Sequence, residues 1–250
     1  MIPSPIRKVL SSIQEHRVRA LLMGGQACVL YGAAEFSRDI DFAILADPRN
    51  LVRLRKALAD LRAEVIAVPP LEPKYLRRGH AVHFRCLHPE ALRMRIDVMS
   101  KMRGMDAFSE LWARRTTLVL SDRLSCELMS LPDLVIAKKT QRDKDWPMLR
   151  RLLEAHYFEH RAYPGRARVT FWLKELRTPE LLVEIAQRYP RPCRRMGAAR
   201  PLLAHALAGD LVEIARGLLE EEMAEREKDR QYWSSLRQEL EFLRRSRRIP

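Results

Sequence analysis

The stretch between residues 23 and 42 limits the local fold of this chain more than any other. A short apolar run leads into Gly24 and Gly25, and a helix-like apolar stretch then separates the glycines from Asp39 and Asp41. Successive strand residues face opposite sides, so the two aspartates share one face about 7 Å apart while the apolar residues beside them face the core. The pattern predicts a strand, a turn, a helix and a second strand with paired acids.

This arrangement of glycines and acids is suited to a metal-bound triphosphate. Two neighbouring carboxylates disfavour each other's ionised form unless a cation lies between them. Nucleotidyl and phosphoryl transfer uses two metal ions about 3.5–4 Å apart. Glycine allows a close approach of the backbone to a ligand, and the start of the following helix offers free N–H groups to an anion. We therefore expect Asp39 and Asp41 to hold magnesium beside the Gly24–Gly25 turn.

A third acid, Asp97, lies in a later stretch that alternates like a strand. Ile96 and Val98 occupy one face of that predicted strand, and Asp97 shares the other with Arg95. An acid flanked by core residues is unusual in a buried strand. One interpretation makes Asp97 a ligand of the catalytic metal that also orients the attacking hydroxyl. The alternatives are a salt bridge to Arg95 or Arg93, or a place on an edge strand.

Together, Gly24-Gly25 and the segment Ser37-Arg38-Asp39-Ile40-Asp41-Phe42 resemble the signature of the DNA polymerase beta-like nucleotidyltransferase superfamily. Within it, the chain resembles the small bacterial nucleotidyltransferases that include the AbiEii-type toxins of toxin–antitoxin pairs. The resemblance implies an α/β (α+β) fold, with a mixed sheet and flanking helices followed by an all-helical C-terminal domain.

The same resemblance implies roles for individual residues. It makes Asp39, Asp41 and Asp97 catalytic ligands of two magnesium ions, with manganese as a substitute, and a nucleoside triphosphate such as ATP the substrate. Gly25 stands where other members have glycine or serine, so a hydroxyl contact to the triphosphate is either lost or supplied by Ser37. Gly24, Gly25 and Ser37 would then cradle the phosphates.

Further basic residues are candidates for phosphate contact. Arg38 directly precedes the acids and could neutralise charge there. The segment after Leu131 resembles the helix and basic turn that follow the catalytic strands in this family, which implies a phosphate contact for Lys138 or Lys139. Lys144 is a weaker candidate. The alternative for these lysines is a solvated helix face.

The net charge of +14 favours a polyanionic partner, and RNA, especially tRNA, is the expected acceptor. A protein hydroxyl or a small molecule stays open as the acceptor, and arginines that merely coat the surface would explain the charge equally well. A second hypothesis is a non-catalytic RNA-binding or interaction module. No apolar run approaches the roughly 18–20 residues that span a bilayer, and the four cysteines are scattered, so we expect a cytoplasmic protein.

The break in helical pattern from Tyr163 to Arg166 predicts a boundary between a nucleotidyltransferase domain, 1–162, and a helical domain, 163–250. One long helix is expected from Asp210 to about Arg245, with its last apolar set available for core packing or oligomerisation. The basic end of the chain, 244–248, could frame a polyanion. Apolar spacing also predicts several elements in the first domain and two segments without regular structure. These are helices at 4–16 and from Pro48, strands at 19–23, 63–68, 80–86 and 94–99, and irregular segments at 71–79 and 190–195.

Overall fold

The computed structural model describes residues 3–34 and 36–246, and these form two compact units. Residues 3–30, 36–137 and 232–246 belong to the first, and residues 31–34 and 138–231 to the second. The predicted boundary at residue 163 therefore falls inside the second unit. The reason is aromatic packing across it, since the ring centroids of Tyr157 and Trp172 lie 4.9 Å apart.

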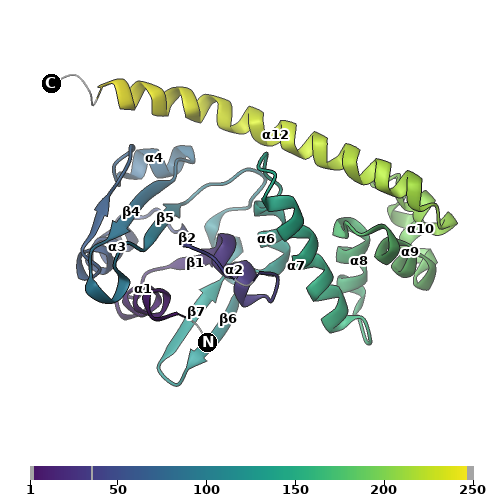
Figure 1. The fold of residues 1–250 in the computed structure, drawn as a ribbon, viewed down its shortest axis with the longest axis horizontal. Helices are drawn as coiled ribbons and strands as arrows, with labels where there is room; N and C mark the ends of the chain where they lie inside the picture. Colours follow the sequence, from purple (N-terminus) through teal and green to yellow (C-terminus); the bar gives the residue numbers. More distant parts are fainter. Residues whose placement is uncertain (1–2, 35, 247–250) are drawn as a thin grey trace. The chain divides into compact units, whose positions relative to one another are not determined.

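A mixed sheet of seven strands forms the centre of the first unit (Figure 1). In chain order the strands are β1 (Ala20–Met23), β2 (Asp39–Ile44), β3 (Ala63–Val65), β4 (Val82–Cys86), β5 (Arg95–Met99), β6 (Thr116–Ser121) and β7 (Leu124–Leu128). In space their order is β3-β4-β5-β2-β1-β7-β6. The β2–β5 and β1–β7 pairs are parallel, and the other neighbours are antiparallel. The predicted mixed sheet with flanking helices is confirmed.

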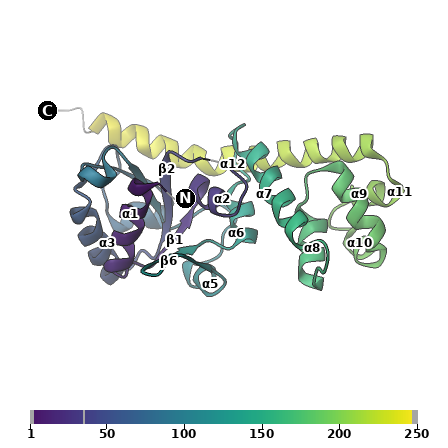
Figure 2. The ribbon, with the colours of Figure 1, turned by 60° about the horizontal axis from the view of Figure 1, so that its bottom comes forward.

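Two predicted amphipathic helices pack beside this sheet, α1 (Ser4–Glu15) and α3 (Pro48–Asp60). They lie side by side (Figure 2), and Ser12 Oγ of α1 donates to Ala57 O of α3 at 3.0 Å. Proline starts α3, where no intrahelical N–H bond is lost, and Asp47 caps it by accepting from Asn50 N at 2.9 Å. The buried helix positions recur every three or four residues, which explains why the sequence alone located both helices.

Two segments that were expected to be irregular are short helices. Residues 71–79 contain α4 (Pro73–Arg78), and residues 190–195 lie in α10 (Pro190–Met196). Each helix has proline in its first turn, where the missing N–H would have had no partner. Gly79 ends α4 with a left-handed φ of 107°, which glycine adopts without a steric penalty. The prolines and glycine therefore mark helix ends here rather than loops.

The other elements of the first unit are α2 (Gly24–Leu30), a 3₁₀ turn (Pro89–Ala91), α5 (Phe108–Ala113) and α6 (Leu131–Ala137). The second unit is helical: α7 (Asp145–His160), α8 (Arg166–Glu175), α9 (Pro179–Arg188), α10 and α11 (Leu203–Ala208), together with residues of α12 (Leu211–Ser246) up to Gln231. The predicted boundary at 163 had placed α7 in the first domain, whereas the structure places it in the second unit.

The predicted long helix is confirmed as α12. Its residues from Tyr232 onward belong to the first unit, where the Glu239 carboxylate pairs with Arg78 and lies 2.7 Å from Nε2 of the fully buried His80. Burial of Leu236 on the same helix supports this docking. In the part of the chain that the structure describes, no helix is both long and apolar enough to cross a membrane.

Candidate functional site

The register between β2 and β5 brings the three predicted acids to one face of the sheet. Asp41 lies opposite Asp97, and Asp39 lies opposite Arg95. Paired residues of neighbouring strands point to the same side, while Ile40 and the other alternate residues are buried on the opposite side. β5 is an interior strand between β4 and β2, so the edge-strand alternative for Asp97 is wrong.

Arg95 is the cation that binds one of these carboxylates and attracts the other two. Its Nε donates to Asp97 Oδ1 and its Nη2 to Asp97 Oδ2, each at 2.9 Å. These hydrogen bonds, and then attraction to Asp97, Asp39 and Asp41, outweigh burial and raise the pKa of the guanidinium above its ordinary value. The salt bridge between Asp97 and Arg95, one of the predicted alternatives, is therefore formed. The Arg95 guanidinium is also attracted electrostatically by Asp39 and Asp41.

His83 completes the surroundings of Asp97, although the sequence alone gave it no role there. It lies opposite Asp97 in the β4–β5 pair, with Nδ1 2.8 Å from Asp97 Oδ1 and 3.1 Å from Arg95 Nη2. Burial by itself raises the pKa of the Asp97 carboxyl, but the hydrogen bonds from His83 and Arg95 hold that pKa below its ordinary value. Only the strand register could have identified His83, since nothing in its local sequence points to this contact.

The glycine pair lies directly against the acids. Gly24 has a φ of 67°, and a Cβ added there would come within 2.6 Å of Asp41 Cγ. A Cβ on Gly25 would lie 2.6 Å from Ser37 Oγ, and that hydroxyl donates to Asp39 O at 3.0 Å. Ser37 thus occupies the space beside Gly25 that a longer side chain at position 25 would need. The turn, the serine and the acids form one contiguous surface.

The basic residues predicted to touch phosphate have different surroundings. Arg38 is exposed next to Asp39. Lys138 Nζ donates to the buried Asp145 at 3.0 Å, and Lys139 Nζ lies 2.6 Å from the buried Glu175, both within the second unit. Lys144 is exposed at the start of α7. The amines of Lys138 and Lys139 are thus paired with carboxylates of their own unit, and the phosphate contact of these two residues stays a prediction.

The carboxylate face can be tested for its fit to magnesium. Carboxylate oxygens are the hard ligands that magnesium prefers, and three of them meet here on two adjacent strands. Both oxygens of Asp97, however, accept from Arg95, and no group of three or more His, Cys, Asp or Glu side chains within residues 3–34 and 36–246 is arranged as a metal site. Asp39 and Asp41 supply two such carboxylates, whereas Asp97 would have to leave Arg95.

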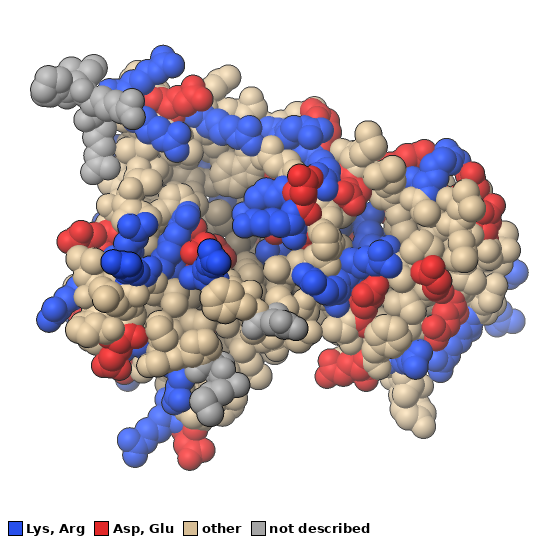
Figure 3. Space-filling model, in the orientation of Figure 1, with Lys and Arg blue, Asp and Glu red and all other residues tan. Residues whose placement is uncertain are grey.

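Basic side chains are spread over both units on the face drawn in Figure 3, where acidic side chains interrupt them. Many basic side chains of the described residues form ion pairs, as Arg216 does with Glu213 and Glu220 on α12. Arg247 and Arg248 of the basic chain end lie outside the described residues. This distribution is compatible with the surface-coating alternative for the charge as well as with a polyanionic partner.

The functional interpretation therefore depends on the site itself. Its strongest features are the Asp41–Asp97 register and the glycine turn against Asp41. In comparisons with known proteins, no family model and no curated protein matches the chain.

Proposed function

We propose that this protein is a magnesium-dependent nucleotidyltransferase, which moves a nucleoside monophosphate from a nucleoside triphosphate to an acceptor hydroxyl. The observation that supports this most is the parallel register of Asp41 with Asp97, with the Asp41 carboxylate packed against Gly24. It brings acids from two strands, separated widely in sequence, next to backbone that can approach phosphate oxygens. The resemblance of the motif to the polymerase beta-like superfamily supports the same activity.

In the proposed reaction, the acceptor oxygen attacks the α-phosphorus in line with the leaving group. The bond from that phosphorus to the bridging oxygen breaks, and pyrophosphate leaves. Magnesium, when bound, neutralises the triphosphate and stabilises charge on the attacking and leaving oxygens. Asp39 and Asp41 would hold it, the Ser37 hydroxyl and Gly25 N–H would face the β and γ phosphates, and a carboxylate oxygen of Asp97 would take the acceptor proton.

Arg95 blocks the proposed role of Asp97 as a proton acceptor, because it donates hydrogen bonds to both Asp97 oxygens. Asp97 becomes available only when the guanidinium turns toward another anion, and the triphosphate itself is the obvious one. Arg95 would thus exchange a carboxylate for a phosphate as the substrate enters.

RNA, and tRNA in particular, is the acceptor that the net charge of +14 favours, in the cytoplasm where triphosphates and RNA occur together. A toxin role in a toxin–antitoxin pair rests on the resemblance alone. Oligomerisation through the end of α12 is part of the proposal, since Phe242 on that helix is 69% exposed.

The direct test is label transfer. The protein is incubated with each labelled nucleoside triphosphate, magnesium and total cellular RNA or protein, and the labelled product is identified. We expect Asp39→Asn and Asp41→Asn to lower transfer by about a hundredfold or more, because each removes a charge that stabilises the transition state. Asp122→Asn, in the exposed turn between β6 and β7, is the matched control. Absence of transfer with every triphosphate and acceptor pool would refute the enzyme.

One observation favours the second candidate, a non-catalytic RNA-binding module: Asp97 is satisfied by Arg95 and His83 without any ligand. A protein of this kind would bind RNA with an affinity that falls steeply with salt. That affinity would be unchanged by Asp39→Asn and Asp41→Asn. RNA binding measured at two salt concentrations for these variants distinguishes the two candidates.

Removing Arg95 should increase the thermal stabilisation that magnesium gives to the protein. Arg95→Met removes a positive charge that attracts all three carboxylates, so a divalent ion gains more by binding there. We expect saturating magnesium to raise the unfolding midpoint of the variant by about 3–6 °C more than that of the wild type. Arg85→Met, at the exposed register partner of Arg95 on β4, should respond like the wild type. An equal response of all three proteins would argue against magnesium at these acids.

A further inference from the structure

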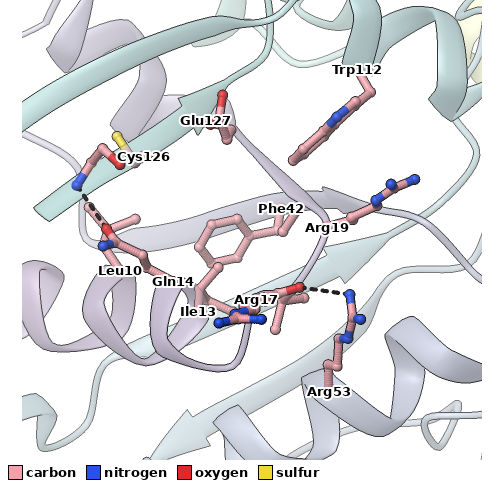
Figure 4. Close-up of a pocket in the computed structure, with 13 residues that line it drawn as sticks. Leu10, Ile13, Gln14, Arg17, Arg19, Phe42, Arg53, Trp112, Cys126 and Glu127 are labelled. Atoms are coloured by element: carbon pink, nitrogen blue, oxygen red, sulfur yellow. Dashed lines mark hydrogen bonds between the residues drawn. The ribbon is translucent and has the colours of Figure 1, made fainter.

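A pocket lies beside the face of β2 that is opposite to the acids. Its volume is about 310 Å³, and it lies within the first unit, between α1, α3, α5 and strands β1, β2 and β7 (Figure 4). Phe42 lines it, and this residue follows Asp41 on β2, so the two side chains leave opposite faces of the sheet. Nucleotide bound at the acids would therefore not occupy this pocket.

The interior of the pocket is apolar and its walls are fixed by hydrogen bonds. Gln14 joins two of these walls, since its Nε2 donates to Arg123 O at 3.1 Å and its Oε1 accepts from Ser125 N at 2.8 Å. In Figure 4 the Trp112 ring extends from α5 toward Phe42. The apolar lining consists of Leu10, Ile13, Val18, Ala20, Phe42 and Cys126. A preformed apolar pocket of this size suits a small ligand.

The rim of the pocket is cationic. Arg17, Arg19 and Arg53 line it, and none of them forms an ion pair with any residue that the structure describes. Arg53 Nη1 donates to Arg17 O at 3.3 Å, and the Arg19 guanidinium lies 6.0 Å from the Trp112 ring centroid. These contacts leave most guanidinium N–H groups available.

The acidic residue of the lining does not neutralise this rim. Glu127 Oε2 accepts from Arg115 Nε at 2.7 Å and from Thr117 Oγ1 at 2.6 Å. Arg115 also lies over the Trp112 ring, at 4.4 Å from its centroid. Charge compensation around Glu127 is therefore complete without Arg17, Arg19 or Arg53. Unpaired guanidiniums around a concave apolar surface attract anions, and their planar donors match carboxylate, phosphate and sulfonate groups.

We infer that this pocket binds a small anionic molecule with a planar apolar body. The body would lie on Phe42 against Trp112, and the anionic group would accept hydrogen bonds from arginines of the rim, Arg53 among them. The site is independent of the proposed nucleotidyl transfer, because it is formed by the other face of β2.

The test uses anilinonaphthalene sulfonate, an aromatic sulfonate whose fluorescence rises on binding, with neutral phenylnaphthylamine as the uncharged counterpart. We expect the sulfonate to bind wild-type protein at least about tenfold more tightly than the neutral compound, because its charged hydrogen bonds add to the same apolar contact. Arg53→Gln should weaken the sulfonate about tenfold. Trp112→Phe should remove energy transfer from that indole to the probe.

Arg55→Gln is the matched control, since Arg55 is also exposed on α3 and also donates to a backbone carbonyl, Leu71 O at 3.1 Å. It should leave the affinity unchanged. The Asp39→Asn/Asp41→Asn double variant should also bind the probe normally, which separates this site from the acids. Equal affinity for the two compounds, equal effects of Arg53→Gln and Arg55→Gln, or loss of binding in the double variant would each overturn the inference.

Discussion

Gly24→Ala should abolish the proposed nucleotidyl transfer and destabilise the first unit by about 2–5 kcal/mol. Two physical effects add. The left-handed backbone at φ 67° penalises any Cβ, and the added Cβ would overlap the Asp41 carboxylate, whose Cγ would be 2.6 Å away. Asp41 would have to leave the face that it shares with Asp97. Chemical denaturation of the purified variant and the label-transfer assay measure the two consequences.

Gly32→Ala is a close control for this prediction. Gly32 also has a left-handed backbone, with a φ of 74°, but a Cβ there meets no atom within 4 Å. The Gly32→Ala variant should lose only about 1–2 kcal/mol of unfolding free energy, from backbone strain alone, and should keep the proposed transfer activity. If the Gly24 and Gly32 variants were equally stable and equally active, the contact between Gly24 and Asp41 would have no functional importance.

Asp145→Asn should destabilise the second unit by about 3–5 kcal/mol, because it leaves the buried Lys138 ammonium without a counter-charge. The Asp145 side chain is 2% exposed and that of Lys138 is 7% exposed. Asp145 also accepts from Thr140 Oγ1 at 2.6 Å and from Arg142 Nε at 2.7 Å. The free energy of unfolding from urea denaturation, followed by tryptophan fluorescence to which Trp146 and Trp172 of the second unit contribute, measures the loss.

Asp143→Asn provides the comparison with an exposed acid two residues away. The Asp143 side chain is 95% exposed and pairs with Arg226, so its loss should cost at most about 1 kcal/mol. In a double variant, Lys138→Met with Asp145→Leu, no buried charge is left unpaired, since Arg142 is 55% exposed, and much of the lost stability should return. A single Asp145→Asn variant as stable as Asp143→Asn would contradict the buried ion pair.

The same pair predicts how stability depends on pH. Burial raises the pKa of the Asp145 carboxyl, but Lys138, Thr140 and Arg142 outweigh burial and hold that pKa below its ordinary value. A depressed folded pKa contributes stability above the unfolded value, about 3.9, and this contribution disappears as the pH falls through the folded pKa. The difference in unfolding free energy between wild type and Asp145→Asn should therefore be full near neutral pH and shrink in acid.

Elements with a regular apolar period were predicted correctly, among them α1, α3, β2, β5 and α12. Each presents one apolar face to a core, so its burial follows the spacing in the sequence. The short helices α4 and α10 were missed because proline was interpreted as a break rather than as a helix start. The grouping into units differed because contacts between α7 and α8 decide it, and those contacts join residues across the Tyr163 turn.

The sequence by itself determined that Asp39 and Asp41 share a face and that a glycine turn precedes them, because strand alternation and glycine conformation are local properties. Only the tertiary structure decided which residues stand beside them. The β2–β5 and β4–β5 registers place Asp97, Arg95 and His83 in contact. Strand register depends on how distant segments pack their apolar faces together, so a linear pattern specifies the face of a residue but not its neighbour across the sheet.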